Sequence, residues 1–297
     1  MRQLTGDRVG LGWRPELAAG ILSHLDGIDV VEVLIEDYLD ASREAVEALA
    51  FLSRQVPVIY HGVSLGLASA HPVDRNRLDL VARTIDTLKV ERWSEHLAFV
   101  RAGNIEIGHL AAAPRTASTI EGACRNLRRV SEVIGIMPAL ENIATLVEPP
   151  GSKMTEPAWI ETIAAEANAD LLIDLHNLWC NAQNAALDPE RYLLSFPLER
   201  ATTVHLSGGC LIHEPVQYSR YAGSVRMLDD HLHPVPAGIF ALLTLLAFHT
   251  PQPLTVIIER DGNYPPFASL LDELQSTRAA LAQGRSQLRR GALDECA

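Results

Sequence analysis

Short apolar runs alternate with longer amphipathic segments along almost the whole chain. Several of the short runs are continuously apolar, which is typical of strands covered on both faces, as in a parallel sheet. Eight runs predict strands: Val9–Trp13, Val30–Ile35, Val56–His61, Trp93–Phe99, Met137–Asn142, Asp170–Leu175, Thr202–Leu206 and Leu254–Glu259.

The segments between these runs have the spacing of amphipathic or buried helices. They include Ser42–Arg54, Asp74–Lys89, Thr119–Ile134, Pro157–Ala167 and Pro236–His249. Eight strands that alternate with helices predict an α/β fold built as a single (β/α)8 TIM-type barrel. We expect this domain to cover residues 1–284 and a polar C-terminal tail to cover residues 285–297.

One connection departs from this regular alternation. The stretch from Ser207 to Val235 is long, contains Gly208 and Gly209, and has little periodicity. Connections of this length are usually functional or disordered. Because this one also contains several ligand-type side chains, we interpret it as a functional loop, placed to act as a lid.

Composition and charge narrow the class of protein. Of the 297 residues, 47% are hydrophobic and 21% are charged, which is typical of a globular enzyme. The net charge of −12 disfavours binding to nucleic acid, because an acidic surface repels phosphates. The four cysteines form no CxxC motif, so reduced thiols are expected. The N-terminus lacks a signal-peptide pattern, and the longest apolar run, Gly238–Phe248, is too short to cross a bilayer. We therefore expect a cytoplasmic protein without a membrane partner.

Ligand-type side chains stand where the predicted strands end, which is the face of a barrel that carries the active site. The strand ends and the loop after the seventh strand contribute His61, Ser94-Glu95-His96, Glu141-Asn142, Asp174-Leu175-His176-Asn177, His205, Asp229-Asp230-His231-Leu232-His233 and Glu259-Arg260-Asp261. Crowded carboxylates and imidazoles are costly unless a cation or hydrogen bonds compensate. Imidazole, carboxylate and amide donors without cysteine suit iron, manganese or zinc. These candidates exceed the needs of one ion, so we expect two or three, bridged by carboxylates such as Glu141 or Asp174.

Some positions in this set remain open. In extended backbone, Asp229 and His231 would point to the same side, and His233 would continue that face as a ligand or as a partner of one. Cys180 and Cys210 fall outside the pattern of strand ends, so we interpret them as packing residues.

The end of the sixth predicted strand allows two arrangements. In a strand, Asp174 and His176 share a face, whereas a turn after Asp174 would bring Asn177 inward, and we favour Asn177. Glu32 and Glu36 either contact the substrate or the ligands, or form structural ion pairs at the barrel rim.

Taken together and in order, these motifs resemble those of the multinuclear non-heme iron-dependent oxidase (MNIO) family, which includes the methanobactin oxazolone synthase subunit. The segments that carry the resemblance span almost the whole chain: Val9-Gly10-Leu11-Gly12, Glu32-Val33-Leu34-Ile35-Glu36-Asp37-Tyr38, His61-Gly62-Val63-Ser64-Leu65, Ser94-Glu95-His96-Leu97, Leu140-Glu141-Asn142, Leu172-Ile173-Asp174-Leu175-His176-Asn177, Val204-His205-Leu206-Ser207-Gly208, Asp229-Asp230-His231-Leu232-His233-Pro234-Val235-Pro236 and Ile258-Glu259-Arg260-Asp261.

The resemblance implies a xylose isomerase-like barrel that holds two or three iron ions, as mixed Fe(II)/Fe(III), and uses dioxygen as co-substrate. The implied metal ligands are His61, His96, Glu141, Asp174, Asn177, His205, Asp229, His231 and Glu259. The side chains implied to support these ligands or contact the substrate are Glu32, Glu36, His176, His233 and Asp261. Some family members have His where this chain has Asn177, so the third ion is the least firmly implied. Many have Asp or Gly where this chain has Leu232, which concerns the surroundings of the ligands and not the ligands themselves.

The same resemblance implies an oxidoreductase that modifies residues, above all cysteine, of a ribosomally made precursor peptide. It also implies a separate partner protein that recognises the leader of that peptide. Three other hypotheses fit a metal-bearing barrel: a divalent-metal sugar isomerase or epimerase of the xylose isomerase-like type, a three-zinc phosphodiesterase, and a scaffold that holds ions without turnover. The net charge of −12 weighs against the phosphodiesterase. The metal and the consumption of dioxygen separate the remaining hypotheses.

Overall fold

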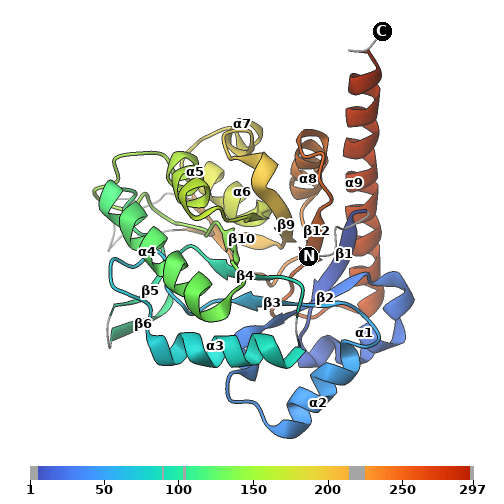
Figure 1. Cartoon of the computed structure of the whole chain (residues 1–297). Coiled ribbons are helices and arrows are strands. Elements are labelled where there is room, and N and C mark those ends of the chain that lie inside the picture. The colour runs from blue at the N-terminus through green and yellow to red at the C-terminus, as the bar shows by residue number, and fades with distance from the viewer. Residues whose placement is uncertain (1–5, 89, 103–104, 214–224, 295–297) are drawn as a thin grey trace.

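The computed structural model describes residues 6–88, 90–102, 105–213 and 225–294. Eight parallel strands close into a barrel, in the spatial order first, eighth, seventh, sixth, fifth, fourth, third and second (Figure 1). Along the chain they are β1 (Arg8–Gly12), β2 (Val30–Leu34), β3 (Val58–Gly62), β4 (Trp93–His96), β7 (Ala139–Glu141), β8 (Leu171–Asp174), β9 (Ala201–Leu206) and β12 (Thr255–Ile258). This arrangement confirms the predicted (β/α)8 barrel, and each barrel strand overlaps one predicted strand.

Helices surround the barrel (Figure 1). They are α1 (Ala18–Ser23), α2 (Arg43–Leu52), α3 (Arg75–Leu88), α4 (Ala117–Ile134), α5 (Glu156–Ala167), α6 (Leu175–Asn184), α7 (Pro189–Leu193), α8 (Ala237–His249) and α9 (Phe267–Asp294). Local sequence sets several helix starts. Thr116 and Thr119 form a capping box at α4, and the hydroxyl of Thr155 accepts a hydrogen bond from the backbone at the start of α5.

Strand periodicity places the candidate ligands above an apolar layer inside the barrel. Val30, Ile59 and Ile257 come from β2, β3 and β12 and form one buried cluster inside the barrel. Because side chains alternate between the two faces of a strand, the residues two positions further along point the same way. In these three strands, those residues are Glu32, His61 and Glu259.

Two antiparallel hairpins leave the regular pattern at the carboxyl end of the barrel. The first pairs β5 (Phe99–Ala102) with β6 (Ile105–Ala111), so the predicted strand Trp93–Phe99 is in fact the barrel strand β4 followed by the start of this hairpin. The second pairs β10 (Gly209–His213) with β11 (Val225–Asp229). The stretch 207–235 is therefore not a structureless loop in its described part. Residues 214–224, and with them much of the expected lid, lie outside the described residues.

Close backbone contacts explain the two glycines at the start of the second hairpin. A Cβ on Gly208 would lie 2.3 Å from the carbonyl oxygen of Pro234, and one on Gly209 would lie 2.0 Å from that of Leu228. Neither position has room for a side chain, so the glycines allow β10 to pack against β11 and the segment that follows it.

The last helix crosses the boundary expected at residue 284. α9 runs to Asp294 and extends beyond the body of the barrel (Figure 1). Arg285 holds this part of the helix in place, since its guanidinium contacts the carboxylate of Asp7 at 2.7 Å and the carbonyl oxygen of Gln252 at 2.7 Å. The expected tail thus begins inside a packed helix. Within the described residues, no helix has the length and apolar character needed to cross a membrane.

Candidate metal centre

The carboxyl ends of the barrel strands bring ligand-type side chains from distant parts of the chain to one buried cluster. Three groups of donor atoms lie within 4.8 Å of one another and share members. They are Glu32, His61 and His205; His61, His96 and Glu141; and Glu141, Asp174, His205 and Glu259. Six of the nine predicted ligands therefore meet in one place, and Glu32 joins them.

Glu141 lies at the middle of the cluster. Its Oε2 atom is 3.3 Å from Nε2 of His61 and 3.2 Å from Nε2 of His96, while its Oε1 atom is 3.3 Å from Nδ1 of His205. The two oxygens thus face different imidazoles. This is the arrangement expected of a carboxylate that bridges two ions.

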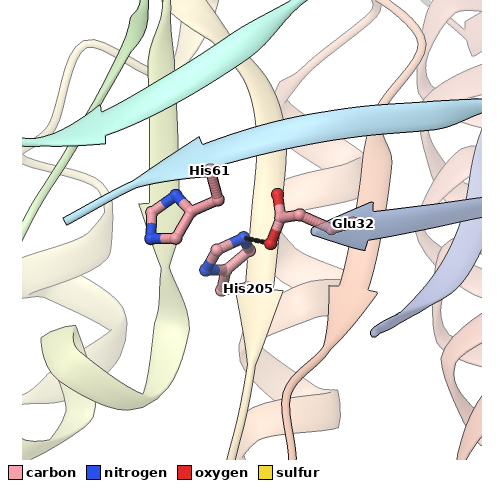
Figure 2. A group of neighbouring side chains, drawn as sticks. All are labelled: Glu32, His61 and His205. Carbon is pink, nitrogen blue, oxygen red and sulfur yellow. Dashed lines mark ion pairs between the residues drawn. The ribbon is translucent and has the colours of Figure 1, made fainter. Parts of the chain in front are cut away.

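His205 is fully buried and has carboxylates on both sides of its ring. Figure 2 shows Glu32 on one side, with its Oε1 atom 2.9 Å from Nε2 of His205, and His61 beside them. On the other side, Nδ1 of His205 is 3.1 Å from Oε2 of Glu259. Burial lowers the pKa of His205, but the charges of Glu259, Glu32 and Glu141 outweigh it and hold the pKa well above its ordinary range.

The outer nitrogens of two further histidines are held by groups of the neighbouring strands. Nδ1 of His96 lies 3.1 Å from the carbonyl oxygen of Gly62. A carbonyl only accepts hydrogen bonds, so Nδ1 carries the hydrogen and the lone pair of Nε2 faces Glu141. Nδ1 of His61 lies 2.8 Å from the hydroxyl of Ser94, which leaves its Nε2 directed toward the same carboxylate.

The strand β8 ends in a helix start that turns Asn177 inward. The carboxylate of Asp174 caps α6 by accepting a hydrogen bond from the backbone N–H of Asn177 at 2.7 Å. The amide of Asn177 donates to the carbonyl oxygen of Asn142, and its Oδ1 atom is buried without a partner. Burial, together with the charges of Asp229 and Glu141, raises the pKa of Asp174 well above its ordinary range.

Asp229 connects the second hairpin to the centre. Its Oδ1 atom accepts a 2.5 Å hydrogen bond from Nδ1 of His176 and a 3.2 Å bond from the hydroxyl of Ser207. Its Oδ2 atom is 2.9 Å from Nε2 of His231. Burial raises the pKa of Asp229, but the contacts with the two histidines outweigh it and bring the pKa to about 2.

The backbone at His231 is not extended, contrary to the expectation from the Asp-x-His spacing. Its φ of 56° lies in the left-handed region, which is unfavourable for a residue with a side chain. Two backbone hydrogen bonds hold it there, from its N–H to Gly208 and from Asp261 to its carbonyl oxygen. The side chain nevertheless reaches Asp229, while Nδ1 contacts Oδ2 of Asp261 at 3.2 Å.

The unpaired polar atoms in this cluster test whether the residues fit metal ions. Buried polar atoms are almost always hydrogen bonded. Here several buried atoms of the cluster lack a hydrogen-bond partner: Oε2 of Glu32, Oε2 of Glu141, Oδ2 of Asp174, Oδ1 of Asn177, both ring nitrogens of His205 and Nε2 of His231. Several of these atoms lie about 3 Å from another potential ligand atom, and no hydrogen bond joins the two. Lone pairs that are directed at a shared cation are placed in this way. The donor set therefore fits divalent or trivalent ions of borderline hardness.

Two of the residues expected to support the ligands lie elsewhere. Glu36 accepts hydrogen bonds from the backbone N–H of Val63 and from the hydroxyl of Ser64, so it holds the loop that follows His61. His233 turns away from the centre because its Nδ1 atom pairs with Oδ1 of Asp230 at 2.9 Å. The expectation that His233 continues the face of His231 is wrong, since the left-handed residue reverses the alternation.

Three supporting contacts are not predicted by the sequence, although the strand ends place Ser94 and Asn142 at the rim. Ser94 holds His61, the side chain of Asn142 bonds the backbone of Asp174 at both N–H and C=O, and Arg14 contacts Asp261 at 2.8 Å. The position of Ser94 could have been inferred, because it shares a strand face with His96. The contact of Arg14 could not, since it joins positions that are 247 residues apart in the chain.

Two cavities lie beside the cluster. One of about 260 Å³ is lined by His96, Asn177, Asp229 and His231, together with Ile143 and Leu146 among others. A second of about 820 Å³ lies over the connection between β7 and α5 and is lined by residues 145–156, parts of α6, and Tyr192. Thr145 and Leu146 line both, so the two spaces adjoin.

Comparisons of the sequence with known proteins identify relatives over nearly the whole chain. The profile of a family described as "RiPP precursor modification enzyme MbnB/TglH/ChrH" matches residues 8–282. A UPF0276 protein of Streptomyces avermitilis is 36% identical over 279 residues, which are 92% of this chain and 54% of that protein, so this chain spans about half of its length. A UPF0276 protein of Rhizorhabdus wittichii is 31% identical over 84% of this chain and 86% of its own length.

Solved structures with the same fold include sugar epimerases. An L-ribulose 3-epimerase superposes with a TM-score of 0.57 at 14% identity and covers 98% of both chains. A D-psicose 3-epimerase from Clostridium cellulolyticum H10 superposes with a TM-score of 0.56 at 11% identity, over 95% of this chain and 99% of that one. At this identity the likeness shows the fold alone, and it confirms a xylose isomerase-like barrel.

Proposed function

The chain belongs to the RiPP precursor modification enzyme family MbnB/TglH/ChrH, and from that membership we propose that it is a multinuclear iron oxidase that uses dioxygen to modify cysteine in a ribosomally made precursor peptide. The family membership confirms the resemblance found in the sequence. The metal, the oxidant and the modified residue are the parts that we add.

The buried cluster around Glu141 is the observation that carries this proposal. It combines imidazole, carboxylate and amide donors, which suit iron, and the overlap of its donor groups supports more than one ion. We propose His61, His96, Glu141, Asp174, Asn177, His205, Asp229, His231 and Glu259 as the ligands, with Glu32 as an additional one, because it lies in the same cluster.

Iron ions bound here would supply a site for dioxygen and a Lewis acid for the peptide. The residues of this chain fix the orientation of the side chains that would bind these ions. Ser94 and the carbonyl oxygen of Gly62 fix the rings of His61 and His96, and Asp261 fixes that of His231. These contacts set which nitrogen of each ring is free to bind a metal, and they hold the ligands in place before the substrate arrives.

The two adjoining cavities provide a path for a peptide. The smaller one, at His96 and His231, has room for one side chain, and the larger one has room for the residues next to it. The larger cavity combines apolar lining, such as Leu146 and Val147, with the charged side chains of Arg115 and Glu148. The proposed protein ligands hold no cysteine, so a peptide thiolate would be the softest donor at the centre.

We also propose a separate partner protein that recognises the leader of the peptide. The net charge of −12 favours a leader or a partner with basic segments, because complementary charge speeds association and selects partners. Co-purification of the chain with the proteins encoded beside its gene tests this part separately from the chemistry.

The proposal is tested by reconstituting the chain with Fe(II) in the absence of oxygen and then incubating it with a cysteine-containing peptide that is encoded beside its gene. We expect more than one iron per chain, dioxygen consumption that depends on the peptide, and a change in peptide mass that is lost when its cysteine is replaced. Full activity with manganese or magnesium on a ketose, with no dioxygen uptake, would instead identify an epimerase. Bound iron with neither activity would leave only a metal-holding scaffold.

A further inference from the structure

A second group of metal-binding side chains lies outside the main centre, on the second hairpin and the segment after it. Donor atoms of Cys210, Asp230 and His233 lie within 4.8 Å of one another. Nδ1 of His233 is 2.9 Å from Oδ1 of Asp230, and Sγ of Cys210 lies within 4.8 Å of the donor atoms of both residues. All three residues are partly exposed, so an ion can reach them from solvent.

The backbone explains why this group is separate from the main centre. Asp229 and Asp230 are adjacent at the end of β11, and their carboxylates point in different directions. Asp229 contacts His176 and His231, whereas Asp230 contacts Cys210 and His233. The backbone N–H of Leu232 also donates to Oδ1 of Asp230 at 2.9 Å, which fixes the orientation of this side chain.

Close packing at Gly208 brings the ends of this group together. A Cβ at Gly208 would lie 2.5 Å from the carbonyl oxygen of His233, so only glycine lets the segment around His233 lie against the start of β10. Cys210 stands two residues further along the chain. The three donors thus come from two segments that the fold presses against each other.

We propose that Cys210, Asp230 and His233 form a second metal site, which binds a divalent ion of the zinc type. One sulfur, one nitrogen and one oxygen donor make a set of intermediate softness, which suits Zn²⁺ and distinguishes this site from the sulfur-free main centre. Donors around a tetrahedral Zn²⁺ are about 3.3 to 3.8 Å apart, within the span of this group. The side chain of His233 is 43% exposed, which leaves the fourth position open to water or an exogenous ligand. An ion here would tie β10 to the segment beyond β11, directly beside Asp229.

Cobalt(II) tests this site without using enzyme activity. Metal-free protein is titrated with Co(II), and the near-ultraviolet absorption of a thiolate bound to Co(II) is followed. We expect a saturable thiolate band in the wild-type protein and none in Cys210→Ser. Zn²⁺ should displace Co(II) and bleach the band, because it binds such sites more tightly. In His233→Ala, we expect the band to require at least about tenfold more Co(II), since even lost supporting contacts weaken metal sites about 10- to 100-fold.

The other cysteines provide matched controls. Cys124→Ser, Cys180→Ser and Cys296→Ser should each keep the band. Cys180 matters most, because its Sγ atom lies 3.7 Å from Nδ1 of His176, next to the main centre. Absence of a band in wild type, or a band that persists in Cys210→Ser, overturns the proposal. An unchanged melting temperature and iron content in Cys210→Ser show that a lost band reflects the site and not unfolding, and they separate this result from the fate of the proposed function.

Discussion

Ser94 holds the imidazole of His61 across two neighbouring strands, with 2.8 Å between its hydroxyl and Nδ1. The two residues are direct partners in the register of β3 and β4. Ser94 also stands two positions before His96, on the same face of its strand. β4 therefore supplies one candidate ligand, His96, and also orients His61 on the neighbouring strand β3. The pairing of these two strands in the barrel fixes both positions.

Replacing Ser94 tests this relationship. In Ser94→Ala, the ring of His61 loses its hydrogen-bond partner, and we expect iron affinity to fall about 10- to 100-fold, as for other supporting partners of metal-bound histidine. Anaerobic titration of metal-free protein with Fe(II) measures the change. Ser94→Thr keeps a hydroxyl and should restore most of the affinity. Equal affinity in wild type and Ser94→Ala would show that the hydroxyl does not orient a ligand.

His231 should be required for both metal binding and turnover. Its side chain lies between Asp229 and Asp261, and two backbone hydrogen bonds hold it there in a left-handed conformation. We expect His231→Ala to lose iron and peptide-dependent dioxygen uptake together. His109→Ala is the matched control, because His109 is exposed on β6, and both quantities should stay at wild-type levels. Unchanged iron content in His231→Ala would contradict the assignment.

Asn177 and His176 are adjacent but should behave differently. The Oδ1 atom of Asn177 is buried and unpaired, as expected of a ligand, whereas Nδ1 of His176 already bonds Asp229. We expect Asn177→Ala to bind about one iron fewer per chain even at saturating Fe(II). His176→Ala should reach the wild-type stoichiometry with weaker binding. Metal analysis over a range of Fe(II) concentrations separates the two outcomes, and the reverse pattern would make His176 the ligand.

Leu146 offers a test of the peptide path that leaves the metal unaffected. It lines both cavities and is 38% exposed, so a larger side chain would narrow the space between them. In Leu146→Trp, we expect KM for the peptide to rise about tenfold or more, which corresponds to about 1.4 kcal/mol or more of lost binding. Iron content should not change. Leu22→Trp, on the exposed side of α1, is the control, and an equal KM in Leu146→Trp would place the peptide elsewhere.

The barrel and most of its rim could be predicted because both depend on short-range patterns. Continuous apolar runs located all eight barrel strands, and closure of parallel strands brings their carboxyl ends together whatever the sequence between them. The strand ends therefore predict that His61, His96, Glu141, Asp174, His205 and Glu259 lie close together, as they do in the structure, while their role as ligands stays a prediction.

The errors lie where the chain leaves that pattern. The prediction for His233 is wrong because it extends the strand alternation through His231, whose left-handed φ depends on hydrogen bonds with Gly208 and Asp261. The second hairpin lies in a stretch that the sequence predicts as a loop, because β10 and β11 are short and their apolar side chains, such as Leu211 and Val225, are exposed. Such features are set by tertiary contacts between residues far apart in the sequence, and no local pattern records them.

The stability of the protein should depend on the ionisation of Glu156, a buried residue that lines the larger cavity. Its carboxylate accepts hydrogen bonds from Tyr192 and Asn181 and lies 3.7 Å from Arg115. Burial raises its pKa above the ordinary value of 4.5, against the opposing effect of Arg115. The folded state therefore holds this proton more tightly than the unfolded chain, so stability from this group is full at low pH and is lost as pH rises through the folded-state pKa.

Glu156→Gln removes the ionisation but keeps an oxygen that can accept both hydrogen bonds. Arg115 stays paired in this variant, since it also contacts Glu148 at 2.7 Å. We expect the melting temperature of Glu156→Gln, relative to wild type, to increase as the pH is raised from about 4 to about 7. Glu161→Gln, at an exposed position of the same helix α5, is the control for the effect of the substitution itself. A difference between Glu156→Gln and wild type that is constant or shrinks with rising pH would mean that the carboxylate is stabilised, not strained, by its buried position.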